Sequence, residues 1–266
     1  TSGMVLYATF RKSSCIIILS KMETGIKIGL LFLLFTSTAF SQQIKKDLPN
    51  IIYIYVDDLG YGELGCYGQQ KIKTPNLDRM AAEGIRFLQH YSSAPVCAPS
   101  RAMLMTGKHA GHSYIRGNYE LGGFADSAER GQMPLPSEAF TVADLLKQKG
   151  YKTALVGKWG LGMGNTEGSP LKHGFDYYYG YLDQKQAHNF YPTHLWENDK
   201  WDALNQPFIN VHKKLDSANV IDADFDYFKG KDYAPALMTG KALHFIDKNK
   251  SNPFFLYLPY TIPHAS

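Results

Sequence analysis

Hydrophobic residues along the chain gather in short runs separated by stretches in which apolar and polar positions alternate with helical spacing. Four runs rich in β-branched and aromatic residues predict strands, at 51–56, 85–91, 151–156 and 254–258. The run at 51–56 has no polar alternation, which is typical of a strand that is covered on both faces. Three stretches predict helices, at 76–83, 141–149 and 235–249.

Residues that favour helix ends flank the predicted helices. Thr74 and Pro75 supply an N-cap and a proline in the first helical position, and Gly84 follows the end of that helix. Thr141 is the predicted N-cap of the second helix, and Gly150 lies just beyond its C-terminus. Threonine and proline favour helix starts, and glycine favours helix ends.

The order of these elements predicts the fold class. Strands alternate with helices, which indicates an α/β fold with a mainly parallel central sheet and helices on both faces. Periodicity fades between 161 and 233, where aromatic residues are frequent, and we interpret this segment as insertions near a site. We favour packing over sugar stacking for these aromatic residues, because buried rings are the commoner case. The pattern indicates one domain.

Residues 22–41 have the composition of an export signal. Lys27 provides a positive charge, 28–35 is an apolar run, and Ala39 and Ser41 are small residues in the positions that a signal peptidase inspects. The apolar run is shorter than the roughly 18 residues that a membrane span needs. We therefore predict a periplasmic or secreted protein without a stable membrane span.

Residues 1–21 precede this signal and are interpreted as upstream translated sequence. Without residues 1–41, 24 basic and 23 acidic residues remain, and the formal net charge falls from +4 to +1. With this balance and no Lys/Arg run, we expect no nucleic-acid partner. Two cysteines remain, too few for a disulfide-built fold, so an ordinary apolar core must provide the stability.

The most informative motif is Cys97-Ala98-Pro99-Ser100-Arg101, followed by Leu-Met-Thr-Gly at 104–107. It resembles the modification site of the formylglycine-dependent sulfatases of the alkaline phosphatase superfamily. In that family a maturation enzyme reads Cys-x-Pro-x-Arg in the nascent chain and oxidises the cysteine to formylglycine. One hydroxyl of its hydrate is the nucleophile, and the sulfated gem-diol can collapse and expel sulfate, whereas a serine sulfate ester would be trapped. The resemblance implies that Cys97 is a precursor of the nucleophile.

Composition alone would favour a different role for Cys97, as a buried structural thiol or as half of a disulfide with Cys66. The complete motif and its flanks favour the precursor. Such a disulfide would consume the thiol that maturation needs. We interpret Cys66 as an ordinary small buried residue.

Asp57 and Asp58 follow the strand at 51–56. They resemble the aspartate pair that holds calcium in this family, where the metal also binds the formylglycine formed from the cysteine, here Cys97. Adjacent carboxylates suit a hard cation. Without the resemblance, a solvated acidic turn would be the commoner interpretation. The family supplies further ligands from an Asp-Asn pair that is C-terminal to residue 266, and we expect 42–266 to be the N-terminal part of a longer catalytic domain.

The resemblance also implies roles for three further side chains. Arg101 would pair with the developing oxyanion or the sulfate, and Lys158, in Gly-Lys-Trp, would contact the sulfate. His264 would protonate the leaving alcohol oxygen, which an imidazole can do near neutral pH. The alternatives are a solvated loop lysine and a surface histidine. By the predicted fold, Asp57, Asp58, Lys158 and His264 lie at the carboxyl ends of strands, where ligands bind in open parallel sheets.

One position departs from the family pattern. The second family signature commonly reads Gly-Lys-Trp-His, and here Gly160 occupies the histidine position. Either another residue, with His112 as a candidate, assists collapse of the sulfated intermediate, or turnover is compromised. A zinc site at His109 and His112 is disfavoured, because two histidines make no closed site. Two further polar residues, Arg116 and Asn118, are expected to line the substrate mouth with these histidines.

The sequence therefore predicts an exported sulfatase that hydrolyses sulfate esters, favouring a sulfated saccharide, with calcium and with formylglycine made from Cys97 by a maturation enzyme. Two alternatives stay open. The first is a phosphonate or phosphate ester hydrolase that uses the same nucleophile. The second is a non-catalytic glycan-binding remnant.

Overall fold

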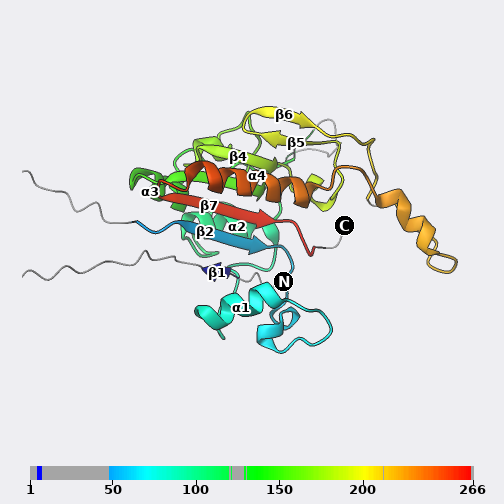
Figure 1. The fold of residues 1–266 in the computed structure, drawn as a ribbon. Coiled ribbons are helices and arrows are strands. Elements are labelled where there is room, and N and C mark those ends of the chain that lie inside the picture. The colour runs from blue at the N-terminus through cyan, green and yellow to red at the C-terminus, as the bar shows by residue number, and fades with distance from the viewer. Residues whose placement is uncertain are drawn as a thin grey trace, which may run out of the picture.

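In a computed structural model, the described residues are 5–7, 48–119, 121, 129, 131–211 and 213–264. They form one sheet with the strand order β1-β2-β7-β3-β4-β5-β6 (Figure 1). The strands are β1 (Val5–Tyr7), β2 (Ile51–Val56), β3 (Lys152–Lys158), β4 (Tyr177–Tyr181), β5 (His194–Glu197), β6 (Lys200–Ala203) and β7 (Phe254–Tyr260). The predicted export signal at 22–41 lies outside the described residues.

The centre of the sheet is parallel. Strand β7 lies between β2 and β3 and is parallel to both, and β3 is parallel to β4. The outer strands β1, β5 and β6 pair antiparallel with their neighbours. The prediction of a mainly parallel sheet is confirmed for the strands that carry the candidate site.

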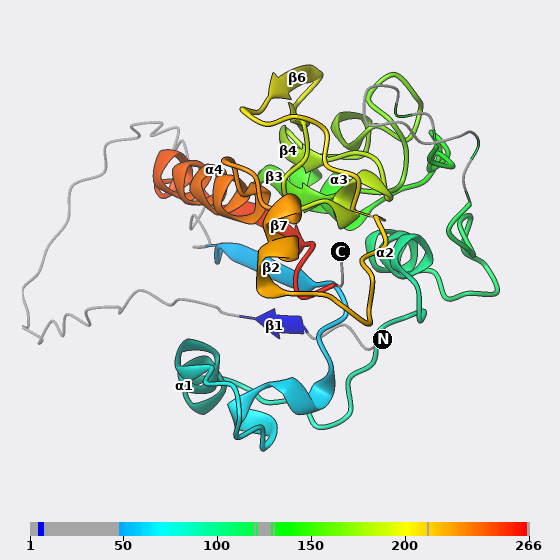
Figure 2. The same ribbon diagram turned by 90° about the vertical axis from the view of Figure 1, so that its right-hand side faces the viewer.

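Helices cover both faces of the sheet, as predicted (Figure 2). The α-helices are α1 (Pro75–Glu83), α2 (Cys97–Thr106), α3 (Val142–Gln148) and α4 (Ala234–Asn249). Helix α1 lies apart from both faces and contacts the turn Gly65–Tyr67. Helix α4 packs on one face through Met238 and Phe245, and Ala102 of α2 and Ala143 of α3 pack in the core of the other face. Short 3₁₀ helices occupy Tyr61–Glu63, Gly65–Tyr67, Pro170–Lys172, Gln186–His188 and Asp222–Phe228. Among the residues with a described position, no helix has the length and apolar character to cross a bilayer.

The predicted helix ends are confirmed, with one difference in chemistry. The Thr141 hydroxyl accepts a hydrogen bond from the Asp144 N–H at 3.1 Å, and the Asp144 carboxylate accepts from the Thr141 N–H at 2.9 Å. Thr74 makes no such side-chain cap. Its hydroxyl instead accepts from the Gly65 N–H and donates to Asp78 Oδ1, so it ties α1 to the preceding loop.

The prediction of a strand at 85–91 is wrong. The segment is irregular, and its apolar side chains are exposed, with Ile85 at 77% and Tyr91 at 72%. A run of β-forming residues becomes a strand only where a neighbouring strand takes up its backbone hydrogen bonds. Here β1 pairs with the outer edge of β2, and 85–91 lies outside the sheet.

The segment 161–233 is also more regular than predicted. Residues 177–203 contain β4, β5 and β6 and extend the sheet, and so they are not an insertion beside it. The helical and alternating patterns are absent because β4 is buried on both faces and reads as a continuous aromatic run. Tyr178, Tyr179 and Tyr181 are fully buried, which confirms packing for these rings. The part that contains Asp222–Phe228 projects from the body of the molecule (Figure 1).

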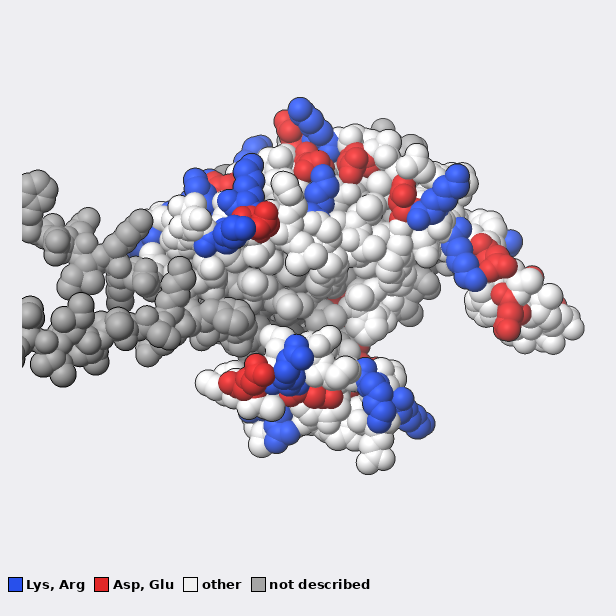
Figure 3. Space-filling view, viewed as in Figure 1, with Lys and Arg blue, Asp and Glu red and all other residues white. Residues whose placement is uncertain are grey.

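Charged side chains on the face shown in Figure 3 are interspersed by sign over α1, α4 and the β5–β6 hairpin. Several of them form ion pairs, such as Lys241 of α4 with Glu197 of β5 at 2.7 Å. Exposed pairs of this kind contribute little to stability. The fold therefore depends on the two apolar clusters on either side of the sheet.

Beside the candidate site, the pairing of β3 with β7 ends early, at a proline in β7 and a glycine in β3. Pairing between β3 and β7 stops at Leu155 and Tyr257, whereas β2 and β7 remain paired to Tyr260. Pro259 has no N–H to donate to β3. Gly157 has φ +143, and a Cβ atom on it would collide with the carbonyl group of Pro259. Glycine is therefore required immediately before Lys158.

We expect Gly157→Ala to lower the free energy of unfolding by about 2 kcal/mol or more, because it combines backbone strain with a clash against main-chain atoms. Urea denaturation measures this change. Gly240→Ala is the matched control, because Gly240 lies in α4 with open space around its Cβ position. Alanine there should raise stability by roughly 0.5–1 kcal/mol. Equal denaturation midpoints for Gly157→Ala and the wild type would contradict the close approach.

Candidate active site

Three adjacent parallel strands bring the predicted residues together at one edge of the sheet. Asp57 and Asp58 follow β2, Lys158 is the last residue of β3, and His264 lies beyond the end of β7. Because β7 lies between β2 and β3, side chains from the two flanking strands meet across its carboxyl end. This convergence is the one that the sequence predicts.

Asp57 is the centre of a buried ion cluster. Lys158 Nζ donates to Asp57 Oδ2 at 2.8 Å, and Arg101 Nη2 donates to the same oxygen at 3.2 Å. Arg101 Nη1 also donates to the backbone carbonyl of Lys158 at 3.0 Å. The Lys158 side chain is 0% exposed, that of Arg101 1% and that of Asp57 8%. The cluster joins β2, β3 and α2.

The charges of this cluster keep Asp57 ionised. Burial alone would raise the pKa of the Asp57 carboxyl, but Arg101 and Lys158 outweigh burial and hold that pKa well below its ordinary value. Arg101 also lies over the Tyr55 ring, 5.5 Å from its centroid. The family resemblance implies that Lys158 contacts the sulfate and that Arg101 pairs with the oxyanion or the sulfate. In the structure their direct partner is Asp57.

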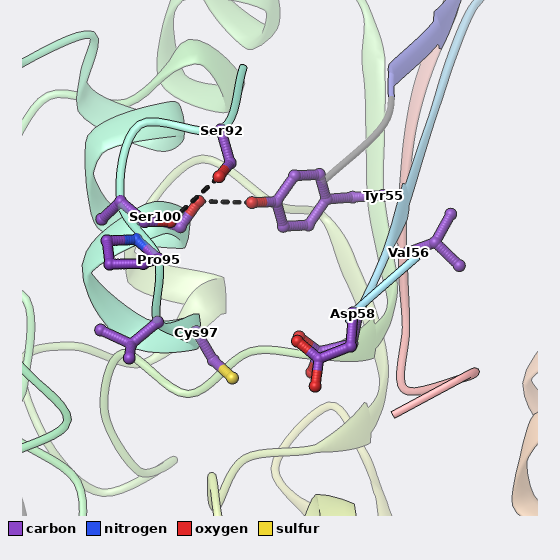
Figure 4. A pocket seen from close by; sticks show the side chains of 10 residues that line it. Tyr55, Val56, Asp58, Ser92, Pro95, Cys97 and Ser100 are labelled. Atoms are coloured by element: carbon purple, nitrogen blue, oxygen red, sulfur yellow. Dashed lines mark hydrogen bonds between the residues drawn. The ribbon is translucent and has the colours of Figure 1, made fainter. Parts of the chain in front are cut away.

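Cys97 is the first residue of α2 and lines a pocket between that helix and the end of β2. Figure 4 shows its sulfur and the Asp58 carboxylate pointing toward one another across the pocket. Other lining residues are Tyr55, Val56, Asp57, Ser92, Ala94, Pro95, Val96 and Ser100. Tyr55 and Ser100 are hydrogen-bonded to each other through their hydroxyl groups. Helix α2 ends at Thr106, and the N–H of the following Gly107 donates to the Met103 carbonyl.

Both described cysteines are free thiols. The alternative of a Cys66–Cys97 disulfide is therefore excluded, and Cys97 keeps the thiol that modification would need. The prediction that Cys66 is buried is wrong, because it is half-buried on the outer 3₁₀ turn Gly65–Tyr67. Its N–H donates to Asp78 Oδ1 at 2.7 Å.

Asp58 and His264 form the more exposed side of the site. Asp58 has a left-handed backbone, with φ +63, which aspartate adopts more readily than most residues. His264 Nε2 lies 3.5 Å from Asp58 Oδ2. The His264 ring is stacked on the ring of His188, with the centroids 4.4 Å apart and the planes at 14°. The sequence analysis missed His188, because no spacing pattern in its segment identifies it.

The residues predicted to line the substrate mouth lie in different surroundings. Asn118 Oδ1 accepts a hydrogen bond from the Ala98 N–H at 3.0 Å, so it contacts the start of the helix that carries Cys97. His112 is exposed and pairs with His109 through their ring nitrogens, 3.2 Å apart. Arg116 donates to the carbonyls of Ser113 and Gly111. The structure therefore places only Asn118 beside α2.

Backbone geometry explains the glycine at position 160. Gly160 has φ +70, and its N–H donates to the Leu182 carbonyl at 3.2 Å. A Cβ atom on it would collide with Oε1 of Gln184, a buried side chain from the segment after β4. Gln184 therefore occupies the space into which a side chain at position 160 would extend.

The donor set at Asp57 and Asp58 fits part of a calcium site. Carboxylate oxygens are the ligands that this hard cation prefers, and it takes six to eight of them. One oxygen of Asp57 is already held by two cations. Within the described ranges, no group of three or more His, Cys, Asp or Glu side chains could hold a metal ion. The two aspartates fit calcium only as a partial ligand set.

The order of these residues along the chain matches one known family. A sequence model with the description Sulfatase matches residues 49–266. The chain belongs to the sulfatase family. The match includes all the residues of the site, from Asp57 to His264.

Similar sulfatases include two curated relatives. Human steryl-sulfatase (Homo sapiens) is 44% identical over 159 residues, which are 58% of this chain and 27% of that protein. N-acetylgalactosamine-6-sulfatase of Sus scrofa is 36% identical over 225 residues, which are 82% of this chain and 40% of the relative. The chain thus spans well under half the length of either protein.

A solved structure supports the fold. A protein from work on the metabolism of multiple glycosaminoglycans by Bacteroides thetaiotaomicron superposes with a TM-score of 0.60 at 28% identity. The superposition covers 82% of this chain and 52% of that one. The parallel sheet with helices on both faces is therefore the fold of this sulfatase-family chain.

Proposed function

We propose that the protein hydrolyses sulfate esters with a formylglycine nucleophile made from Cys97 and with calcium at Asp57 and Asp58. The observation that carries this proposal is the placement of Cys97. It begins α2 on one wall of a pocket whose other wall carries the two aspartates. In hydrated form, formylglycine supplies a hydroxyl nucleophile and a route by which sulfate is expelled.

The start of α2 favours negative charge at the reacting centre. The N-terminus of a helix carries partial positive charge and unpaired N–H groups, which stabilise anions placed against it. Asn118 takes up the Ala98 N–H and fixes the first turn that bears Cys97. A sulfate group in the pocket would therefore lie at the positive end of this helix.

Arg101 and Lys158 prepare the metal-binding carboxylate. They keep Asp57 ionised in a buried position, where a carboxylate alone would tend to take up a proton. Their positive charge also lies against Asp57 in the wall of the pocket, which favours the negative charge that develops in the transition state. His264, held beside Asp58, is the group that would protonate the leaving oxygen.

We further propose a sulfated saccharide as substrate. The support is the extent of the sequence matches. The match to N-acetylgalactosamine-6-sulfatase covers 82% of this chain, whereas the match to steryl-sulfatase covers 58%. An export signal at 22–41 agrees with an extracellular polymer as substrate. Residues 42–266 would then be the N-terminal part of the catalytic domain, matured by a formylglycine-generating enzyme.

The test uses the complete protein, expressed beside a formylglycine-generating enzyme. Mass spectrometry of the peptide that contains Cys97 should show a loss of about 18 Da, from the exchange of sulfur for oxygen with two fewer hydrogens. Hydrolysis is then measured as sulfate release from a 6-O-sulfated amino sugar and an aryl sulfate, and as phenol release from an aryl phosphodiester. We expect the sulfate esters to be turned over faster.

Two outcomes would overturn this proposal. Faster turnover of the phosphodiester would assign the protein to phosphate or phosphonate ester hydrolysis. A fully matured protein that binds sulfated sugars without releasing sulfate would be a glycan-binding remnant.

A further inference from the structure

His188 lies outside every motif that the sequence analysis identified, yet it reaches the site. It is the last residue of the 3₁₀ helix Gln186–His188, which follows β4. Its ring lies nearly parallel to that of His264, with the centroids 4.4 Å apart and the planes at 14°. This contact joins the segment after β4 to the segment after β7.

The segment that carries His188 is held firmly. Asp183 Oδ1 accepts hydrogen bonds from the N–H groups of Lys185 and Gln186, at 2.7 and 3.1 Å. After the 3₁₀ turn, the Asn189 carbonyl accepts from the Tyr181 hydroxyl at 2.7 Å, and Asn189 Nδ2 donates to the Ile209 carbonyl at 3.2 Å. Gln186 and Asn189 are buried. These hydrogen bonds hold the backbone on both sides of His188 in place.

His264 has less support from its own segment. Strand pairing of β7 ends at Tyr260, so His264 lies beyond the ladder of the sheet. Its side chain is 20% exposed, and its ion-pair partner Asp58 lies 3.5 Å from Nε2. The ion pair with Asp58 is made at the edge of the ring and does not by itself define the plane of the imidazole. The stack with His188 fixes the plane of the ring, and a contact on the face uses none of its nitrogen atoms.

We propose that His188 is a positioning residue that holds the His264 imidazole in the plane in which it meets Asp58 and the leaving oxygen. The inference rests on the proposed function, because it presumes that His264 protonates the leaving group. Small errors in the placement of a reacting group have large effects on rate, so loss of the stack should appear in the step that needs the proton.

Two substrates of different leaving group test this role. The leaving group of a sugar sulfate is an alkoxide, which needs the proton. The leaving group of 4-nitrophenyl sulfate is a stable phenolate, which needs it little. We expect His188→Ala to lower kcat for the sugar sulfate by roughly 10- to 100-fold. The change for 4-nitrophenyl sulfate should stay within about threefold, because general acid catalysis contributes little there.

Two variants serve as matched controls. His188→Phe keeps a flat ring on His264 and should restore kcat for the sugar sulfate to within about fivefold of the wild type, because stacking needs only the face of a ring. His244→Ala removes an exposed histidine of α4 and should change neither rate. Equal losses for both esters in His188→Ala would show a merely structural role and overturn the proposal.

A second measurement does not depend on turnover. Diethyl pyrocarbonate modifies accessible imidazoles, and peptide mass spectrometry gives the rate at His264 in the complete, metal-free protein. We expect faster modification of His264 in His188→Ala and the wild-type rate in His188→Phe. If His264 were modified at the same rate in His188→Ala as in the wild type, the proposed contact between the two rings would be contradicted. If the wild type released no sulfate, the proposed function would fail, and this measurement would still decide the contact.

Discussion

Replacing Cys97 by alanine is expected to lower kcat for sulfate esters by at least about 10³-fold, because the variant has no precursor of the nucleophile. Cys97 is half-buried at the start of α2, and alanine is an excellent helix former, so the thermal midpoint should change little. Sulfate release and thermal unfolding of the complete protein measure the two effects. Full activity in Cys97→Ala would exclude Cys97 as the precursor.

Cys97→Ser is the informative companion variant. A serine offers one hydroxyl, so a sulfate transferred to it would remain as a stable ester, whereas a gem-diol can release it. We expect one sulfate to be bound covalently per protein molecule, without further turnover. Intact mass spectrometry after incubation with an aryl sulfate detects this adduct. Sustained turnover by Cys97→Ser would contradict the need for formylglycine.

Replacing Asp57 by asparagine is expected to lower the free energy of unfolding by about 3–5 kcal/mol, because the change leaves buried cations without their counter-charge. Arg101 and Lys158 are both nearly inaccessible to solvent, and both donate to Asp57 Oδ2. Urea denaturation of the metal-free protein measures the loss. An effect below about 1 kcal/mol would show that this cluster contributes little to the fold.

Asp58→Asn provides the matched control. The Asp58 side chain is 33% exposed and pairs with His264 at the long distance of 3.5 Å, so its loss should cost less than about 1 kcal/mol. Asparagine also tolerates the left-handed backbone at this position.

Both variants should weaken calcium binding, which is measured as a smaller rise of the thermal midpoint on adding calcium. Equal calcium responses of Asp58→Asn and the wild type would remove Asp58 from the metal site.

Strands β2, β3 and β7 could be predicted from the sequence, because each is a short run rich in β-branched and aromatic residues. Strand β4, a continuous tyrosine-rich run, was interpreted as part of an insertion. The run at 85–91 also contains β-branched and aromatic residues but forms no strand, since pairing depends on a partner elsewhere in the chain. The β5–β6 hairpin was not predicted, because its sequence gives only a weak strand pattern. Its strands are short, and their aromatic and charged residues do not alternate clearly.

The part of the candidate site that is set by the order of the parallel strands was predictable. The carboxyl ends of parallel strands meet at one edge, and this rule brings Asp57, Lys158 and His264 together from distant parts of the chain. Sequence patterns could not show which partners these side chains take. The pairing of Arg101 with Asp57 and the stack of His188 on His264 arise from packing that no local spacing encodes.

The buried position of Arg101 has a consequence for the order of folding and the proposed modification of Cys97. The arginine is part of the Cys-x-Pro-x-Arg motif that the proposed modifying enzyme must read, yet in the folded chain its side chain is 1% exposed. Its guanidinium is covered once Asp57 and Lys158 close around it, and these come from strands on either side of the motif in the sequence. Recognition of the motif and closure of the sheet thus exclude one another. If Cys97 is modified as proposed, it would have to be oxidised before the chain folds, and a molecule that folds first would keep its thiol.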